Sequence, residues 1–202
     1  MKKKKDNKKR KKIKMYNYLI IFFSLTFILL SIAVVIRYIE GQKGEKEVKE
    51  MLDVMNSIEE IDGDNLDSDL QMGKYNIIGR IIIPVINLEY PVLEKTTTES
   101  LNLSITKLAG PNLNEWGNVS LAGHKTRNGT LFGNLAKVKV NDIIEIIDSK
   151  NKTINYKVYK IYNVNPDDPS PTKQNNMDER ELTLITCTTG AKKRLIVKAR
   201  EM

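Results

Sequence analysis

Eighteen consecutive residues near the N-terminus, Leu19 to Ile36, carry no charged side chain. As a helix, such a run spans about 27 Å at ~1.5 Å per residue, which is close to the ~30 Å hydrocarbon core of a bilayer. Tyr16, Tyr18 and Tyr38 flank the run, where interfacial aromatic residues are common. The sequence therefore predicts one N-terminal transmembrane helix, over residues 15–38.

A cleaved signal peptide is the competing interpretation of this run. The apolar stretch of a signal peptide usually covers ~7–15 residues and precedes a small-x-small cleavage site. Here the run is longer, and it ends in Ile36-Arg37-Tyr38-Ile39-Glu40, which lacks that pattern. We therefore expect an uncleaved signal-anchor.

Positive charge is concentrated before the apolar run. Residues 1–14 hold ten Lys or Arg and one acidic residue, a net charge of +9, and the whole chain carries +8, which leaves −1 for residues 15–202. A nucleic-acid-binding domain usually has clustered cations, so this balance argues against a nucleic-acid partner. Basic residues beside a span stay in the cytoplasm. We predict a cytoplasmic tail over 1–14, a single-pass cell-membrane anchor and an extracellular C-terminal domain.

The segment that follows the span differs in composition from the rest of the chain. Residues 39–71 are rich in Glu, Asp, Lys and Gly, with loose helical spacing over Glu45–Ile61 and a break at Asp62-Gly63-Asp64-Asn65. This pattern predicts an extracellular stalk over 39–71. Residues 72–202 then form the globular domain, which is long enough to bury its own core.

The globular domain has the pattern of an all-β fold. Its short β-branched or alternating segments are separated by turn residues, and Pro91 makes one of them an edge or interrupted strand. Short helices are expected near Thr98–Leu103 and Leu131–Ala136. We predict a mostly β fold, a closed seven- to eight-stranded β-barrel, with strands at Ile77–Ile83, Leu88–Leu93, Asn118–Ala122, Ile143–Ile147, Thr153–Tyr162, Glu181–Cys187 and Leu195–Ala199.

Cysteine and histidine each occur once, at Cys187 and His124, and each ends a β-like segment. A lone cysteine in an exported domain cannot form an intramolecular disulfide and is open to oxidation, which favours a chemical use for it. A small buried apolar cysteine is the alternative. A short loop is expected to bring Arg194 near Cys187. A thiol, an imidazole and a guanidinium together are the groups of a cysteine acyl-transfer site.

The run Thr183-Leu184-Ile185-Thr186-Cys187, with Arg194 seven residues on, resembles the active-site signature of sortases, the membrane-anchored cysteine transpeptidases of Gram-positive bacteria. The run Leu121-Ala122-Gly123-His124 resembles the histidine motif of the same family. The basic tail, the signal-anchor and the C-terminal barrel match the family's layout, so the resemblance covers residues 15–202.

This resemblance implies a role for each matching residue. Cys187 would be the nucleophile that cleaves an LPxTG-like sorting signal through a thioester, His124 the general acid and base, and Arg194 the group that positions the substrate and stabilises the oxyanion. Thr186 would line the substrate groove, and the loop Asn165–Pro171 would recognise the substrate. The implied partners are surface proteins with C-terminal sorting signals and a cell-wall peptidoglycan precursor as the amine acceptor.

Two features bear on the subclass. Residues 40–72 contain no proline, hence no Asp-Pro-aromatic lid motif, and the chain stops at Met202 soon after the last predicted strand. Pilus-polymerising sortases often carry both that lid and a C-terminal membrane segment. We therefore expect a class D-like anchoring enzyme, with classes A and E as alternatives.

No cofactor is predicted, because one histidine, one cysteine and scattered acids give no recognisable metal-ligand spacing. Calcium stays an alternative, and the acidic residues available for it are Glu115, Asp167, Asp168, Asp178 and Glu179.

Two other functions stay open on the sequence alone. A membrane-anchored cysteine endopeptidase would use the same residues with water as the acceptor. A non-catalytic β-barrel binding module would use Cys187 only to fill its core, and the thiol would then be unreactive.

Overall fold

A computed structural model describes residues 2–59 and 70–202 of the chain. The chain divides between Glu45 and Lys46 into two compact units. The predicted break at Asp62-Gly63-Asp64-Asn65 lies outside the described residues. The boundaries predicted for the tail, span, stalk and domain stay predictions.

The first unit is the greater part of a single helix, α1, which covers Lys2–Glu59. This range contains no proline, so no backbone donor is lost along the helix. The side chains of Leu19–Ile36 are nearly all exposed, although they are apolar. Within residues 2–59 and 70–202, α1 is the one helix whose length and composition suit a membrane span, which agrees with single-pass anchoring.

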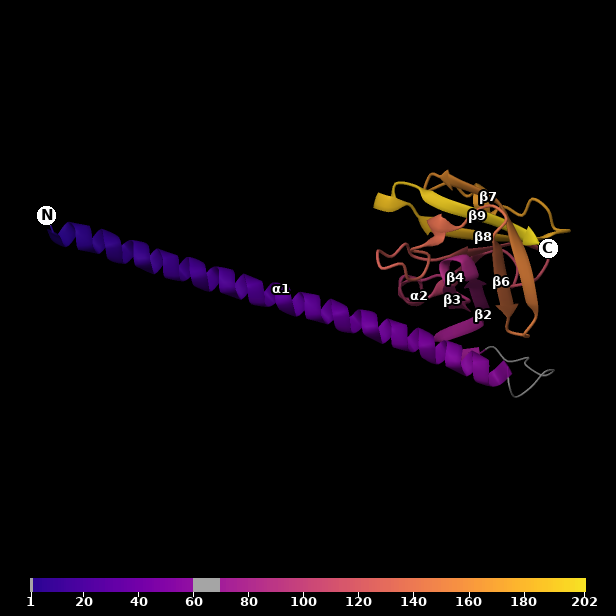
Figure 1. Cartoon of the computed structure of the whole chain (residues 1–202), viewed down its shortest axis with the longest axis horizontal. Coiled ribbons are helices and arrows are strands. Elements are labelled where there is room, and N and C mark those ends of the chain that lie inside the picture. Colours follow the sequence, from indigo (N-terminus) through magenta and orange to yellow (C-terminus); the bar gives the residue numbers. More distant parts are fainter. Residues whose placement is uncertain (1, 60–69) are drawn as a thin grey trace. The chain divides into compact units, whose positions relative to one another are not determined.

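The second unit is built on a sheet of nine strands in the order β1-β2-β3-β4-β5-β8-β9-β7-β6. Strand β2 pairs with β6 as well as with β3, so β2 to β9 close into an eight-stranded barrel and β1 extends it beside β2 (Figure 1). The prediction of a closed, mostly β barrel is confirmed. The strands are β1 (Leu70–Met72), β2 (Tyr75–Ile83), β3 (Leu88–Leu93), β4 (Ile105–Ala109), β5 (Gly117–Ala122), β6 (Ile143–Asp148), β7 (Thr153–Val164), β8 (Arg180–Cys187) and β9 (Arg194–Glu201).

Barrel closure depends on a bend in β2. At Gly79 the register of β2 with β3 shifts, and φ is +148°, a conformation that favours glycine. A Cβ at this position would lie 2.2 Å from the carbonyl oxygen of Ile147 on β6. Glycine therefore lets β2 approach β6 closely enough for the sheet to close.

Two strands were not anticipated from the sequence, β1 and β4. Strand β4 contains Thr106 and Lys107, which weaken its apolar pattern. It pairs with β3 in parallel over two residue pairs, beginning at Val92, and with β5 in antiparallel. Pro91 cannot donate to that ladder and lies just before it. Strand β3 is continuous over Leu88–Leu93 and has a neighbour on each side, so the prediction of an edge or interrupted strand is wrong.

The short helices partly match the expectation. Helix α2 covers Thr98–Leu103 as predicted, and its capping box joins Thr97 to Ser100. The helix predicted over Leu131–Ala136 is wrong. Leu131 has a left-handed φ of 50° and bridges to Lys125, and only a short 3-10 turn, η2 (Leu135–Lys137), follows. The other 3-10 turns are η1 (Pro84–Ile86), η3 (Ser170–Thr172) and η4 (Thr189–Ala191).

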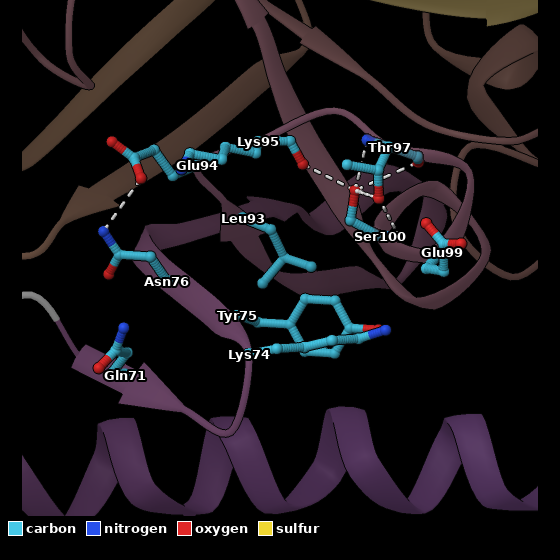
Figure 2. A pocket seen from close by; sticks show the side chains of 10 residues that line it. All are labelled: Gln71, Lys74, Tyr75, Asn76, Leu93, Glu94, Lys95, Thr97, Glu99 and Ser100. Carbon is cyan, nitrogen blue, oxygen red and sulfur yellow. Dashed lines mark hydrogen bonds between the residues drawn. The ribbon is translucent and has the colours of Figure 1, made fainter.

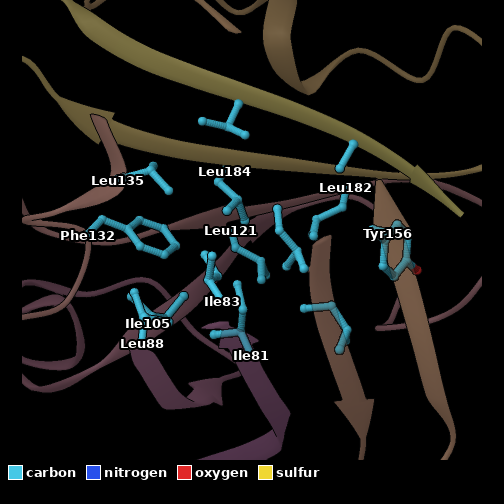
Figure 3. Close-up of a cluster of buried hydrophobic side chains, with 14 of the residues drawn as sticks. Ile81, Ile83, Leu88, Ile105, Leu121, Phe132, Leu135, Tyr156, Leu182 and Leu184 are labelled. Atoms are coloured by element: carbon cyan, nitrogen blue, oxygen red, sulfur yellow. The ribbon is translucent and has the colours of Figure 1, made fainter. Parts of the chain in front are cut away.

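The barrel interior is one cluster of aliphatic side chains from its strands, together with Phe132 and Leu135 (Figure 3). Tyr156 is buried in this cluster, and its hydroxyl donates to Oδ1 of Asn114 at 3.2 Å. Burial raises the pKa of Tyr156 well above its ordinary value, because the phenolate would be poorly solvated there. The hydroxyl is thus kept as a neutral donor in an otherwise apolar core.

The last turns of α1 pack on the barrel through a second apolar cluster. Val48, Met51 and Met55 of the helix lie buried against Ile77 and Leu93, with Leu103 of α2 beside them. Val48, Met51 and Met55 follow the three- and four-residue spacing of one helix face. Polar contacts support the same attachment, since Nη1 of Arg80 donates to Oδ1 of Asn56 at 2.6 Å and pairs with Glu89 at 3.2 Å.

This packing generates a stability prediction. Met51 is only 1% exposed, so Met51→Ala removes buried apolar contacts and leaves a cavity, and it should lower the free energy of unfolding of the barrel by about 2–4 kcal/mol. Asp53→Ala, at an exposed position on the same helix, should change that free energy by less than about 0.5 kcal/mol. Urea unfolding followed by tryptophan fluorescence measures both. Equal stability of the two variants would mean that the helix end is not part of the folded unit.

Candidate active site

The parallel pairing of β5 with β8 places the C-terminal ends of these two strands side by side. The register runs from Gly117 opposite Arg180 to Ala122 opposite Ile185. Beyond the last pair the contact continues, because the N–H of Gly123 donates to the carbonyl oxygen of Ile185 at 3.2 Å. His124 and Cys187 each lie two residues past that pair. The single histidine and the single cysteine of the sequence therefore lie at the same end of neighbouring strands.

The antiparallel pairing of β8 with β9 adds the guanidinium. Arg194, the first residue of β9, is the register partner of Cys187, the last residue of β8. Nη1 of Arg194 donates to Sγ of Cys187 at 3.2 Å. The connecting loop is held closed by Thr188, whose N–H donates to the carbonyl oxygen of Lys193 at 2.9 Å. Gly190 in this loop has φ +76°, which suits the tight return.

Cys187 is a free thiol that is neither fully buried nor fully exposed. By strand alternation its side chain shares a face with Ile185 and Thr183, whereas Leu182 and Leu184 point into the core. A half-exposed thiol at the end of a rigid strand is open to an incoming group. It is also fixed by the sheet behind it, as a nucleophile requires.

The position of His124 is fixed by the close packing of Gly123, the residue before it. A Cβ at Gly123 would lie 2.6 Å from Cδ1 of Ile105 and 2.7 Å from Cδ2 of Phe132, so only glycine fits between β5 and the core. The carbonyl oxygen of His124 accepts the N–H of Phe132 at 3.1 Å. In the described chain no hydrogen bond joins the imidazole to the Cys187 thiol, although the strand register brings the two residues to the same end of β5 and β8.

Thr186 lies on the opposite face of β8 from Cys187 and is 3% exposed. Its hydroxyl donates to the carbonyl oxygen of Gly123 at 2.8 Å. This bond ties the strand that carries the thiol to the residue before the histidine. Burial favours a positioning role for Thr186, and the groove-lining role implied by its place in the motif stays a prediction.

The loop between β7 and β8 is docked on the barrel. The side-chain amide of Asn118 donates to the carbonyl oxygens of Pro171 and Lys173, at 2.9 and 3.1 Å, and its Oδ1 accepts from the hydroxyl of Thr183. The Gln174 amide bonds both backbone groups of Asn118, at 2.7 Å each. Sequence reasoning singled out the loop but missed this clamp, because Asn118 and Gln174 belong to no motif and meet only through the fold.

The docked loop also has internal order. The N–H of Ser170 donates to Oδ1 of Asp168 at 2.8 Å, and this backbone hydrogen bond is the main reason why the pKa of Asp168 lies below its ordinary value. Among the described residues no group of three or more His, Cys, Asp or Glu side chains gathers at one point where a metal ion could sit. Calcium binding by the acids near this loop stays an open expectation.

A separate cavity of about 450 Å³ opens between the β1–β2 turn and α2 (Figure 2). Its walls carry charges of both signs, and Cys187, His124 and Arg194 are not among its lining residues. The cavity is lined by Gln71, Lys74, Tyr75, Asn76, Leu93, Glu94, Lys95, Thr97, Glu99 and Ser100.

The site thus combines a half-exposed thiol, a guanidinium in contact with it and an imidazole just past the end of the neighbouring strand, all at one end of a closed β-barrel. That combination of fold and side chains is typical of a cysteine acyl-transfer enzyme. Comparison with known proteins identifies the family. The model of the Sortase domain family matches residues 81–202, and the chain belongs to the sortase family.

Individual relatives agree with this membership. Sortase A of Bacillus anthracis is 34% identical over 119 residues, which cover 58% of this chain and 55% of that protein. The structure of sortase A from Corynebacterium diphtheriae is 31% identical with a TM-score of 0.58, covering 64% of this chain and 62% of that one. A structure of Clostridium perfringens sortase C with the C-terminal cell wall sorting motif is 28% identical with a TM-score of 0.56, covering 63% and 71%. The chain spans about half the length of the curated relatives it matches. Because the relatives include sortases named A and C, the subclass stays a prediction.

The contact between Arg194 and Cys187 generates the second prediction. Arg194→Lys keeps the charge but replaces a planar fork of donors with a point charge. If Arg194 holds the substrate carbonyl, thioester formation with a sorting peptide should slow by roughly 10²-fold. The control is Arg200→Lys on the same strand, where the guanidinium is exposed and pairs with Glu179, and it should slow the reaction less than about twofold. Near-normal acylation by the Arg194→Lys variant would show that the Arg194 guanidinium does not act in the reaction.

The hydrogen bond of Thr186 generates the third prediction. Thr186→Val leaves the carbonyl oxygen of Gly123 without its donor and should lower the free energy of unfolding by about 1–2 kcal/mol. Acylation should slow while KM for the peptide stays unchanged, and Thr186→Ser should restore both properties. Urea unfolding and steady-state kinetics measure the effects. A raised KM with unchanged stability would instead assign Thr186 to the substrate groove.

Proposed function

We propose that this protein is a membrane-anchored cysteine transpeptidase that cleaves an LPxTG-like sorting signal and transfers the cleaved protein to an amine. The observation that carries the proposal is the 3.2 Å contact of the Arg194 guanidinium with the Cys187 thiol, at the strand end beside His124. Family membership supports the same reaction class.

In the proposed first half-reaction, the sulfur of Cys187 attacks the carbonyl carbon of the scissile peptide bond. The Arg194 guanidinium lies against that sulfur and can donate to the carbonyl oxygen as negative charge develops on it. His124 takes the proton that the Cys187 thiol loses and gives it to the departing amine. The C–N bond breaks, a thioester to Cys187 forms, and the C-terminal fragment leaves with the proton.

In the proposed second half-reaction, a neutral amine attacks the thioester carbonyl. The C–S bond breaks, a new amide bond forms, and the amine's proton returns through His124 to the thiol. A thioester is more reactive toward an amine than the amide it replaced, so the energy of the peptide bond is retained for the transfer. The enzyme thus ends the cycle with Cys187 as a free thiol.

The substrate side of the proposal is a peptide held over the outer face of β5 and β8. The loop Asn165–Pro171 reaches that face at Pro171, whose carbonyl oxygen accepts from the side-chain amide of Asn118, and we propose that it recognises the sorting signal. The solved sortase C of Clostridium perfringens holds a C-terminal cell wall sorting motif, which supports a peptide substrate for this chain too.

The membrane side of the proposal places the barrel outside the cell. The apolar helix would anchor the chain, and ten basic residues among the first 14 would keep the N-terminus in the cytoplasm. The acceptor would then be an amine of a peptidoglycan precursor. We propose anchoring of surface proteins over pilus polymerisation, because residues 40–72 lack an Asp-Pro-aromatic lid motif.

The decisive experiment separates transfer from hydrolysis. The full chain in detergent micelles is incubated with an LPxTG peptide, with and without hydroxylamine or triglycine, and the products are identified by mass spectrometry. We expect a thioester on Cys187 and diversion of the acyl group onto the added amine, with neither in Cys187→Ala. Cleavage that gives only the hydrolysed peptide at all amine concentrations would identify an endopeptidase. A thiol that resists alkylation in the folded chain, with no cleavage, would identify a binding module.

A further inference from the structure

The mouth of the candidate site is strongly and locally basic. Two loops border the thiol and the imidazole, residues 125–130 directly after His124 and residues 188–193 directly after Cys187. They carry Lys125, Arg127, Lys192 and Lys193, and neither loop contains an acidic residue. We call these four residues the basic rim. Residues 15–202 as a whole net to −1, so the rim is a local feature and not part of a general positive charge.

The rim is open and its charges are not neutralised within the described chain. Arg127, Lys192 and Lys193 are exposed, and Lys125 is partly exposed. None of the four forms an ion pair with any residue of the described ranges. By contrast Arg180, Lys198 and Arg200, which lie elsewhere on the barrel, each pair with a glutamate. Cations left unpaired beside a reaction centre raise the local concentration of anions there.

The two loops that carry the rim form one ordered unit. Nζ of Lys125 donates to Oγ1 of Thr189 at 3.0 Å, which joins the loop after the histidine to the loop after the cysteine. The second loop is closed on itself, since the N–H of Lys193 donates to Oγ1 of Thr188 at 3.1 Å. In the first loop the hydroxyl of Thr130 donates to that of Thr126 at 3.0 Å. These hydrogen bonds order the backbone of both loops, so less backbone entropy is lost there when a ligand binds.

The position of the rim assigns it to the amine side of the reaction. The outer face of β8 leads to Cys187 and is bordered further back by the docked loop Asn165–Pro171, where the acyl half of a peptide would lie. The rim lies past the ends of the strands, and one of its loops begins at His124, the residue proposed to handle the amine proton. An acceptor amine enters where the leaving amine departs.

We propose that the basic rim binds a phosphate or carboxylate group carried by the amine acceptor. This inference rests on the proposed transpeptidase function and adds to it the chemical class of the second substrate. The reaction is aminolysis of the Cys187 thioester, in which the amide C–N bond forms, the C–S bond breaks and one amine proton returns to the thiol. The rim would also lower the pKa of an ammonium beside it, because like charge disfavours the charged form, and only the neutral amine attacks.

The test compares acceptors that share a glycyl-glycyl amine end and differ in the charge that follows it. The full chain is placed in phosphatidylcholine nanodiscs with an LPxTG peptide, and KM is measured for triglycine amide, for glycyl-glycyl-glutamate and for glycyl-glycyl-phosphoserine amide. We expect a KM about tenfold lower for the anionic acceptors, as three or four partly screened charges would give. The preference should fade at high salt. A lower KM for the phosphoserine probe than for the glutamate probe would identify phosphate as the preferred group.

Matched variants locate the effect. In Arg127→Gln/Lys192→Gln/Lys193→Gln the KM ratio between neutral and anionic acceptors should fall from about ten to near one. The control Lys150→Gln/Lys152→Gln/Lys157→Gln removes the same charge at exposed positions of β7 and the turn before it, and should keep the ratio. Equal KM values for neutral and anionic acceptors in the unmodified chain, or equal loss of the ratio in both triple variants, would overturn the proposal.

Two further outcomes would give the rim a different role or none. If the rim variant changes turnover only in nanodiscs that contain phosphatidylglycerol, the rim contacts the membrane surface and the acceptor proposal is overturned. Thioester formation is followed by intact mass in the absence of any acceptor. If no thioester forms, the proposed function itself fails and this inference falls with it, whereas a normal thioester without acceptor preference rejects the rim alone.

Discussion

The parallel pairing of β5 with β8 is the constraint on which the candidate site depends. The register ends at Ala122 opposite Ile185, and each chain then continues for two residues to His124 and Cys187. A shift of one residue would turn one of these side chains to the opposite face. The register is therefore secured twice, by the N–H of Gly123 and by the buried hydroxyl of Thr186, which both bond across the two strands. The β8–β9 hairpin then brings Arg194 to the thiol without any further long-range contact.

This arrangement separates rigid parts from parts that recognise ligands. The three reactive side chains stand at strand ends of a closed barrel, where the sheet fixes their backbone. The loops around them differ in character. The loop before β8 is proline-rich and clamped through Asn118, whereas the two loops beyond Cys187 and His124 are small and basic. We infer that the loop before β8 binds the peptide and that the two basic loops bind the anionic acceptor. One end of the barrel would then bind two substrates of different chemistry.

Much of this could be predicted from the sequence because the signals are local. Alternating β-branched runs predicted seven of the strands, and the spacing from Cys187 to Arg194 predicted a short hairpin. The failures have physical reasons. Strand β4 was missed because Thr106 and Lys107 weaken its apolar pattern. A helix was wrongly predicted at Leu131 because the apolar residues around it have helical spacing, which gives no sign of the left-handed φ that Leu131 adopts. The Asn118 clamp, and the attachment of Met51 to the barrel, join residues far apart in sequence, and no local pattern encodes such contacts.

The central claim is that Cys187, His124 and Arg194 act as one unit in acyl transfer. A double-mutant cycle tests it most directly, with thioester formation on Cys187 measured in a single turnover for the unmodified chain, His124→Ala, Arg194→Ala and the double variant. Residues that act as a unit give strongly non-additive losses, so the double variant should be little slower than the slower single variant. Losses that multiply in the double variant would show independent roles and would contradict this account of the site.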